Sequence, residues 1–418
     1  MSSSFIRGIA VFGYLALAVP RALGAQDGSD SGRTPRSVTL AEAIDAALHH
    51  NPDLLIARFA VDSARSEHRV ATALPNPTLS ATPNTPYQYG VSIPIDFTPG
   101  RFYRARAASF GVKASENDRE EAVRQTKLAV ARAFFDILLA QEKRALALAR
   151  RDVVQQVLVA DSVRLRSGDV PFHNLVRSEV EMARADADVA RVDVDVQTNR
   201  FVLQGLMGTA LPDTGLSTNG SLEYRAFTIP SDSVTTFAAA QRPDVAAASQ
   251  RVEQSRVVQH AASMLLVPIP VLSYVRQYTA PFESGHFYSL GLSFDLPILN
   301  LHAGERARAA AGVEIAELAR RRAEVQLKRE VAAAEAEFRI QRRLVERYQG
   351  GLLRRVDESV IAVRYSYTRG ASSLLDVLDA VRAQQELRTD YVIALRDYWV
   401  SVHALNAAVG ADVLGAGF

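Results

Sequence analysis

Cysteine is absent from the 418-residue sequence, which excludes disulfide bonds, thiolate chemistry and a lipid-modified N-terminal cysteine. Aromatic residues make up only 7% of the chain while apolar residues reach 48%, a balance that favours long helices over compact cores. After residue 25 no stretch approaches 18 consecutive apolar residues, so no transmembrane helix is predicted. A membrane role through β-strands stays open, because strands span a bilayer with a much weaker sequence signature.

An excess of basic charge is also missing once the N-terminus is set aside. Arg7, an apolar run over 8–19 and small residues up to position 25 are typical of a secretory signal peptide. We therefore expect residues 1–25 to be removed and 26–38 to form a flexible lead-in. Leaving out the two arginines of 1–25 lowers the 48 basic residues to 46, equal to the 46 acidic ones. Nucleic-acid binding needs a basic excess, so no nucleic-acid partner is expected.

What the chain does contain is an internal duplication. Gly168 and Gly208 are 40 residues apart, as are Gly370 and Gly410, and the two pairs are offset by 202. Each pair predicts a helix that arrives at a glycine turn and a long helix that leaves it. The predicted plan is a first repeat at 39–208 with its turn at Gly168, an inter-repeat connection at 209–233, a second repeat at 234–410 with its turn at Gly370, and a tail at 411–418.

Both repeats open with signals for a helix start. Thr39 and Glu42 form a capping box, which predicts a short helix from Leu40 that stops before Asn51. Proline at position 52 then opens a helix to about residue 73. A proline again follows a polar residue at 242–244, and this pattern predicts a helix to about residue 266 in the second repeat.

Two segments, 87–97 and 288–296, alternate between apolar and small or polar residues, the pattern of half-buried strands. Partner strands are predicted at about 78–82 and 271–279, so each repeat holds one hairpin, at about 77–97 and 270–297. The first partner strand is short, which leaves its length open. The apolar side is expected to face lipid, through Tyr89, Val91, Ile93, Tyr288, Leu290, Leu292 and Phe294.

The remaining sequence predicts very long helices. Proline is absent from 101–167 and from 304–369, so each stretch could form a rod of roughly 100 Å. Helices this long usually belong to coiled coils. Steps of three and four residues predict an apolar seam on each returning helix, at Val176, Val180, Ala183, Ala187, Ala190, Val194 and Phe201 and at Leu387, Tyr391, Ala394, Tyr398, Val402 and Leu405. The hairpins are then expected at one end of a helical body and the glycine turns at the other.

Four strands per chain cannot close into a barrel, and an open strand edge cannot exist in hydrocarbon. The strand prediction therefore requires two or more copies of the chain. Three copies would supply twelve strands around a lumen wide enough for solutes.

The opening TLAEAI…NPDL, the two hairpins, the glycine turns and the spacing to Gly208 and Gly410 resemble the TolC-type outer-membrane efflux proteins. The resemblance implies a mainly α fold with a small β part. Its long antiparallel coiled-coil helices form an α-barrel, and four strands per chain contribute to a trimeric twelve-stranded β-barrel. It also implies a homotrimer in the outer membrane of a Gram-negative-type bacterium, in contact with lipid and extending into the periplasm. Its partners would be an inner-membrane pump and a periplasmic adaptor (membrane fusion) protein, with the lumen as the exit duct.

The resemblance also implies an acidic aperture at the periplasmic tip. Asp376 and Asp379 match the family's pore-lining aspartate pair, and their spacing of three places both on one helical face. In a trimer they would form two rings that favour cations and raise some carboxyl pKa values. Without the resemblance, a solvated turn would be the preferred interpretation. Tyr367 matches a tyrosine that latches the closed tip, whereas Ser372 and Asn174 stand where some relatives have an arginine and an aspartate.

Other functions find less support. No phosphate loop, dinucleotide fingerprint, G-x-S-x-G, HExxH or Cys/His cluster occurs, so we expect no catalytic, cofactor or metal site and no enzyme. The exit duct of a type I protein-secretion system uses the same fold, and sequence does not separate it from drug or metal-ion efflux. A soluble periplasmic coiled-coil scaffold or adaptor is the alternative from another class, and it would need no detergent.

Overall fold

The computed structural model describes residues 37–83, 87–209, 216–229, 234–278 and 286–416. The predicted signal peptide, most of the lead-in and parts of the 209–233 connection lie outside these ranges. The helices are α1 (Leu40–His50), α2 (Pro52–Thr72), α3 (Pro99–Ser167), α4 (Phe172–Leu206), α5 (Val234–Gln241), α6 (Pro243–Ser263), α7 (Ala303–Arg347), α8 (Leu353–Thr368) and α9 (Leu374–Val409), with short turns η1 (Met264–Leu266) and η2 (Tyr348–Leu352). The strands are β1 (Ser37–Val38), β2 (Thr78–Thr82), β3 (Tyr87–Pro94), β4 (Ser217–Thr218), β5 (Val271–Tyr278) and β6 (His286–Ser293).

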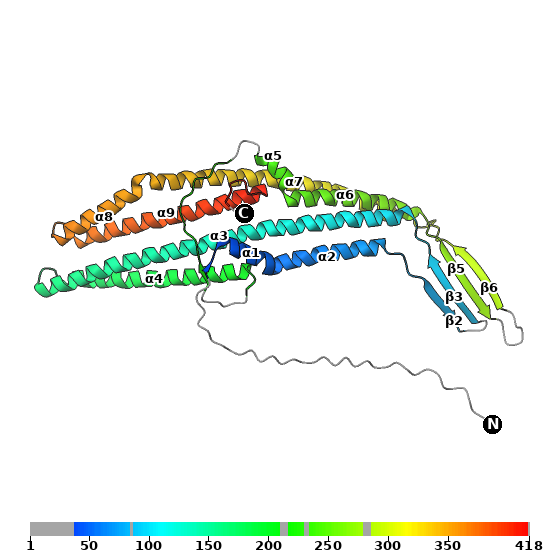
Figure 1. Ribbon diagram of the computed structural model, residues 1–418, viewed down its shortest axis with the longest axis horizontal. Coiled ribbons are helices and arrows are strands. Elements are labelled where there is room, and N and C mark those ends of the chain that lie inside the picture. Colours follow the sequence, from blue (N-terminus) through cyan, green and yellow to red (C-terminus); the bar gives the residue numbers. More distant parts are fainter. Residues whose placement is uncertain (1–36, 84–86, 210–215, 230–233, 279–285, 417–418) are drawn as a thin grey trace, which may run out of the picture.

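The molecule is a long helical body with a small sheet projecting from one end (Figure 1). The 69-residue α3 runs the length of the body, with α2 along one part of it and α4 along the other. From the second repeat, α6 and α9 also pack against α3 and against α7. The helix reversals lie at the end opposite the sheet, as the sequence predicts. The mainly helical fold with a small β part is confirmed.

The sheet joins the hairpins of the two repeats in the order β2-β3-β5-β6, with every neighbouring pair antiparallel. Central pairing of β3 with β5 sets Val91 opposite Tyr274 and Ser92 opposite Ser273. Because paired residues share a face, the predicted apolar side is continuous across all four strands. Both strands end earlier than predicted: β3 ends at Pro94, and β6 ends at Ser293, so Phe294 lies just beyond the strand. Apolar and polar residues continue to alternate after Ser293, although the chain has already left the sheet there.

Each repeat closes by docking the end of its returning helix onto its own beginning. Asn51 caps α2 by accepting a hydrogen bond from the Asp53 amide at 2.8 Å, and its side-chain amide donates to the Leu206 carbonyl at 2.8 Å. Gly208 follows there with φ of 67°, and a Cβ at that position would collide with the His50 carbonyl. Only glycine allows this approach, which accounts for its place in the repeat spacing.

The second long helix is not continuous, and the prediction of an unbroken rod over 304–369 is wrong. It splits into α7 and α8 at η2, where Gly351 adopts φ of 102°. The absence of proline did not reveal this break, because Gly351 allows it instead. A side chain at Gly351 would meet no neighbour within 4 Å, so the backbone conformation alone requires glycine there.

The two predicted apolar seams differ in outcome. On α9, Ala394, Tyr398, Val402 and Leu405 are buried, as predicted. On α4 the predicted seam is not buried within the chain, because Val176, Val180, Val194 and Phe201 are exposed in the single copy. The residues of α4 that are buried instead are Met182, Ala185, Val196 and Leu203. Within the described ranges, no helix combines the length and apolarity needed to cross a membrane.

Residues 216–229 cross the helical body at mid-height as a strap (Figure 1). Leu216, Leu222 and Phe227 of the strap are buried in the main core. The Tyr398 hydroxyl donates to the Arg225 carbonyl at 2.7 Å, and the Trp399 indole N–H donates to the Glu223 carbonyl at 3.0 Å. The strap therefore ties α9 to the rest of the body through both polar and apolar contacts.

Candidate functional site

The end opposite the sheet is built from two helix reversals, one in each repeat. Gly168 ends α3 with φ of 80°, and Gly370 follows α8 with φ of 76°. Ser373 then caps α9. An apolar cluster behind the turns joins α3, α8 and α9, and its buried members are Val157, Val360, Val377, Leu378 and Val381. The two reversals are therefore packed together and present one common tip.

A buried carboxylate connects the two hairpins at this tip. Asp161 of α3 is fully buried and accepts hydrogen bonds from the Tyr367 hydroxyl of α8, at 2.7 Å, and from the Ser178 hydroxyl of α4. Burial raises the pKa of Tyr367, and the hydrogen bond to Asp161 raises it further. We call Asp161, Ser178 and Tyr367 the tip latch. An unpaired buried carboxylate is costly, so these two donors favour the arrangement in which the hairpins touch.

Arg164 supports the same contact from α3. Its guanidinium lies 4.6 Å from the centre of the Tyr367 ring, and it donates to the Tyr367 carbonyl at 3.2 Å. An arginine thus reaches the latch tyrosine although position 372 holds a serine. Asn174 lies in the first turn of α4, where its backbone N–H donates to the Pro171 carbonyl at 3.0 Å. It is not one of the three residues of the tip latch.

Sequence reasoning found Tyr367 but missed Asp161, Arg164 and Ser178. The sequence did contain one signal for Asp161. It follows Val154 and Val157 at spacings of three and four residues, so it continues an apolar seam of the helix. A carboxylate at such a position is rarely buried without partners. The identity of those partners was not readable, because Tyr367 lies 206 positions away.

Asp376 and Asp379 stand on the first turns of α9, and both are exposed. Asp376 accepts hydrogen bonds from the Ser373 amide at 2.8 Å and from its hydroxyl at 2.7 Å, completing a capping box. The Ser373 hydroxyl and then its amide lower the pKa of Asp376. Within one chain, Asp376 therefore also has a structural role that the sequence reasoning did not include.

Asp379 belongs to a chain of ion pairs that crosses the hairpins. Arg382 lies 3.7 Å from Asp379 and 3.8 Å from Glu181 of α4. Glu181 is buried and also pairs with Arg184 at 2.8 Å and with Arg150 of α3 at 3.6 Å. Charged contacts thus extend from the exposed tip carboxylate into the interface between α3, α4 and α9.

The predicted lipid-facing residues lie on one side of the sheet. Tyr89, Val91 and Ile93 share that side with Leu272, Tyr274, Tyr288, Leu290 and Leu292 through the strand register. They are exposed, Leu290 to 79%. The opposite side carries mainly small or polar residues, including Ser80, Gln88, Ser92, Ser273, Gln277 and Ser289. Phe294 is exposed at the helical end of this surface.

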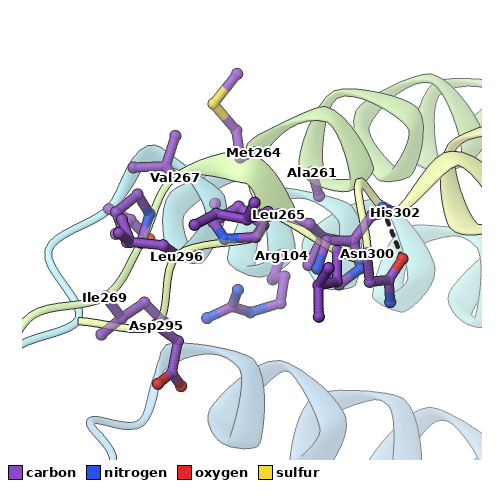
Figure 2. A pocket seen from close by; sticks show the side chains of 16 residues that line it. Arg104, Ala261, Met264, Leu265, Val267, Ile269, Asp295, Leu296, Asn300 and His302 are labelled. Atoms are coloured by element: carbon purple, nitrogen blue, oxygen red, sulfur yellow. Dashed lines mark hydrogen bonds between the residues drawn. The ribbon is translucent and has the colours of Figure 1, made fainter.

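A pocket of about 490 Å³ lies where the sheet meets the helical body. Figure 2 shows Leu265, Val267, Ile269 and Leu296 around it, with Arg104 beneath. Arg104 pairs with the buried Asp96 at 2.7 Å. The lining is mostly aliphatic, which suits a junction between an apolar sheet surface and a charged helical body.

Comparisons with known proteins agree with this arrangement. Residues 43–209 match the family described as outer membrane efflux protein. The chain is 22% identical over 384 residues to the cobalt-zinc-cadmium resistance protein CzcC of Cupriavidus metallidurans, covering 89% of this chain and 90% of that protein. Its fold is similar to that of the CmeC outer membrane channel of Campylobacter jejuni, with TM-score 0.79, 17% identity and coverage of 95% and 94%. It is also similar to the open state of the MtrE outer membrane channel of Neisseria gonorrhoeae, with TM-score 0.76, 21% identity and coverage of 92% and 91%.

Proposed function

We propose that this chain belongs to the outer membrane efflux protein family and is the outer-membrane exit duct of a tripartite efflux system. It is an outer-membrane protein that extends into the periplasm, and its family comprises channels rather than enzymes. In the proposed role, solute passes through it passively. A periplasmic adaptor protein and an inner-membrane pump supply cargo and energy.

One observation carries the proposal: the sheet has two unlike exposed faces and two free edges. The apolar face suits lipid and the polar face suits a water-filled lumen. Among the described residues, β2 and β6 each pair with a single strand. Since β2 and β6 run in opposite directions, β6 of one copy can pair with β2 of the next in the same antiparallel pattern. Closure by three copies gives the twelve-stranded barrel.

Exposed apolar stripes on the helices support assembly from several copies. Ile56, Phe59 and Val70 lie exposed on α2, and Ile315, Leu318 and Val325 on α7. The exposed valines of α4 form a third stripe. Large apolar surfaces of this kind usually mark an interaction face. In the proposed trimer, the stripes close the helical barrel between neighbouring copies.

At the tip, Asp376 and Asp379 of three copies would form two acidic rings around the duct. The tip latch holds the second hairpin against the first, and we take this as the closed arrangement. Opening then requires Tyr367 to leave Asp161. The name of the similar protein CzcC makes divalent metal cations the first cargo class to test, and acidic rings agree with cationic cargo.

Introduced cysteines test the assembly cleanly, because the chain has none of its own. Ser80→Cys with Ser289→Cys places a thiol on each free edge of the sheet. Treatment of outer membranes with a short bis-maleimide should give a ladder that ends at three copies. In the control Ser92→Cys with Ser273→Cys, the two positions face each other within one copy and should crosslink only internally. A protein that stays monomeric and needs no detergent would refute the duct.

A further inference from the structure

The apolar face of the sheet divides into two bands along the strands. Near the helical body its side chains are aliphatic: Leu79, Val91, Ile93, Leu272, Leu290 and Leu292. Towards the hairpin loops they are aromatic: Tyr87, Tyr89, Tyr278 and Tyr288, with Tyr274 at the boundary. An aliphatic band edged by aromatic rings is the surface of a barrel at the limit of the hydrocarbon. The aromatic band therefore marks the outer headgroup region.

Arg276 lies within this aromatic band. In the described strand residues it is the one Lys, Arg, Asp or Glu side chain, and it sits on the apolar face. Its cross-strand partners are Tyr89 and Tyr288, and Tyr274 and Tyr278 flank it on its own strand. A charged residue on a lipid-facing surface is costly near the bilayer midplane and tolerated near the interface, so the position of Arg276 fits the headgroup region.

The tyrosines hold the guanidinium in place without neutralising it. Its central carbon lies 4.7 Å from the Tyr278 ring centre and 5.6 Å from that of Tyr288. Tyr89 packs edge-on against Tyr278 at 6.1 Å, and Tyr274 stacks on Tyr288 at 6.2 Å. In the part of the chain that the structure describes, no carboxylate lies in ion-pair distance of Arg276, and its Nε is buried with no hydrogen bond. The site combines a cation, phenolic hydroxyls and apolar surroundings.

We propose that Arg276 and its surrounding tyrosines bind the phosphate of an anionic lipid headgroup in the outer leaflet. A guanidinium matches two phosphate oxygens with parallel N–H donors, and phenols can add further donors. The aliphatic band below accommodates the acyl chains of the same lipid. This inference rests on the proposed function, because it needs the apolar face to meet a membrane.

The test uses the full-length mature protein reconstituted in phosphatidylcholine vesicles that contain lipid A. Flotation first reports whether the protein inserts. Native mass spectrometry of the extracted protein then counts retained lipid A, with and without its phosphate groups. The variants are Arg276→Gln, Arg276→Lys and, as a matched control, Arg329→Gln on the exposed surface of α7. A separate arm adds millimolar inorganic phosphate.

We expect Arg276→Gln to lower retention of phosphorylated lipid A roughly tenfold or more. Retention by Arg276→Lys should lie between that of Arg276→Gln and that of the wild type, because lysine keeps the charge but cannot donate two parallel hydrogen bonds. Arg329→Gln should match the wild type, and lipid A without phosphate should not distinguish the variants. Equal retention by Arg276→Gln, or displacement by inorganic phosphate, would overturn the site while leaving the duct intact. A wild type that does not float would overturn the duct and the site together.

Discussion

The hydroxyl of Tyr367 donates a 2.7 Å hydrogen bond to Asp161, a carboxylate that no solvent reaches. Donor and acceptor belong to different repeats, so this single contact couples the two hairpins of the tip. Its strength follows from burial, because a hydrogen bond to a desolvated charge is worth more than one in water.

Loss of this contact should favour the open tip. Tyr367→Phe keeps the ring over which Arg164 lies and removes only the donor to Asp161. A hydrogen bond to a charged group contributes about 1.5–3 kcal/mol, so the closed arrangement should lose much of its preference. We expect a higher single-channel conductance in planar bilayers. Tyr365→Phe, an exposed neighbour on α8, is the matched control, and an unchanged conductance for Tyr367→Phe would show that the latch does not gate.

Charge removal at the tip should reduce cation selectivity. Asp376→Asn and Asp379→Asn keep a side-chain acceptor, so the cap of α9 can persist while the negative charge is lost. Reversal potentials measured in a salt gradient should shift towards non-selective values for each variant and further for the pair. Asp195→Asn removes an exposed charge on α4, away from the tip, and should leave them unchanged. If the tip variants behave like this control, the acidic rings do not line the duct.

The break between α7 and α8 should depend on Gly351 and not on Gly350. Alanine at Gly351 has open space but must adopt φ of 102°, which costs about 1–2 kcal/mol. Gly350 has φ of −65°, which alanine accepts. Thermal unfolding followed by circular dichroism should show a lower midpoint for Gly351→Ala alone. Equal midpoints for the two variants would mean that the helix straightens without cost.

The stability of the helical body should fall in mild acid because of His403. This imidazole is fully buried beside Phe135, at 5.5 Å between ring centres, and burial lowers its pKa to about 4 although Asp412 acts in the opposite direction. The unfolded chain takes up the proton near pH 6.5 and the folded one only near 4. Stability is therefore complete above pH 6.5 and decreases as pH falls to 4, by about 3 kcal/mol. Urea unfolding of His403→Leu should lack this part of the slope, and an identical slope would contradict the assignment.

An arginine on the apolar face should hinder insertion. Leu292→Arg should cost about 2–4 kcal/mol if this position meets hydrocarbon near the midplane. Folding into vesicles, measured against urea, should report this loss. Ser289→Arg on the opposite face should insert nearly as well as the wild type. The reverse result would mean that the faces of the sheet are assigned the wrong way round.

Elements with a short sequence period were predictable from the sequence, whereas contacts between distant segments were not. Alternation located both hairpins because a strand has a period of two, and Thr39 with Glu42 marked the start of α1. The same alternation overran the end of β6 at Phe294, since periodicity carries no signal for where pairing stops. Steps of three and four residues on α4 identified an apolar stripe but could not tell which helix it faces.

At the tip, recognition of Tyr367, Asp376 and Asp379 came from resemblance to a family. Their hydrogen bonds and ion pairs are visible only in the structure. The capping role of Asp376 was within reach of sequence, because Ser373 precedes it by three positions. The partners of Asp161 were not, because they lie on two other helices.

The strap over 216–229 has a mechanical consequence. It clamps α9 at Tyr398 and Trp399, about 36 Å along the helix from Leu374. In the proposed duct, a movement of α9 at the tip would pivot about this contact, because the segment from Val402 to Val409 is seated in the core. Such a movement would leave the sheet in place, so the barrel of the proposed duct could stay sealed in the membrane while the periplasmic entrance opens.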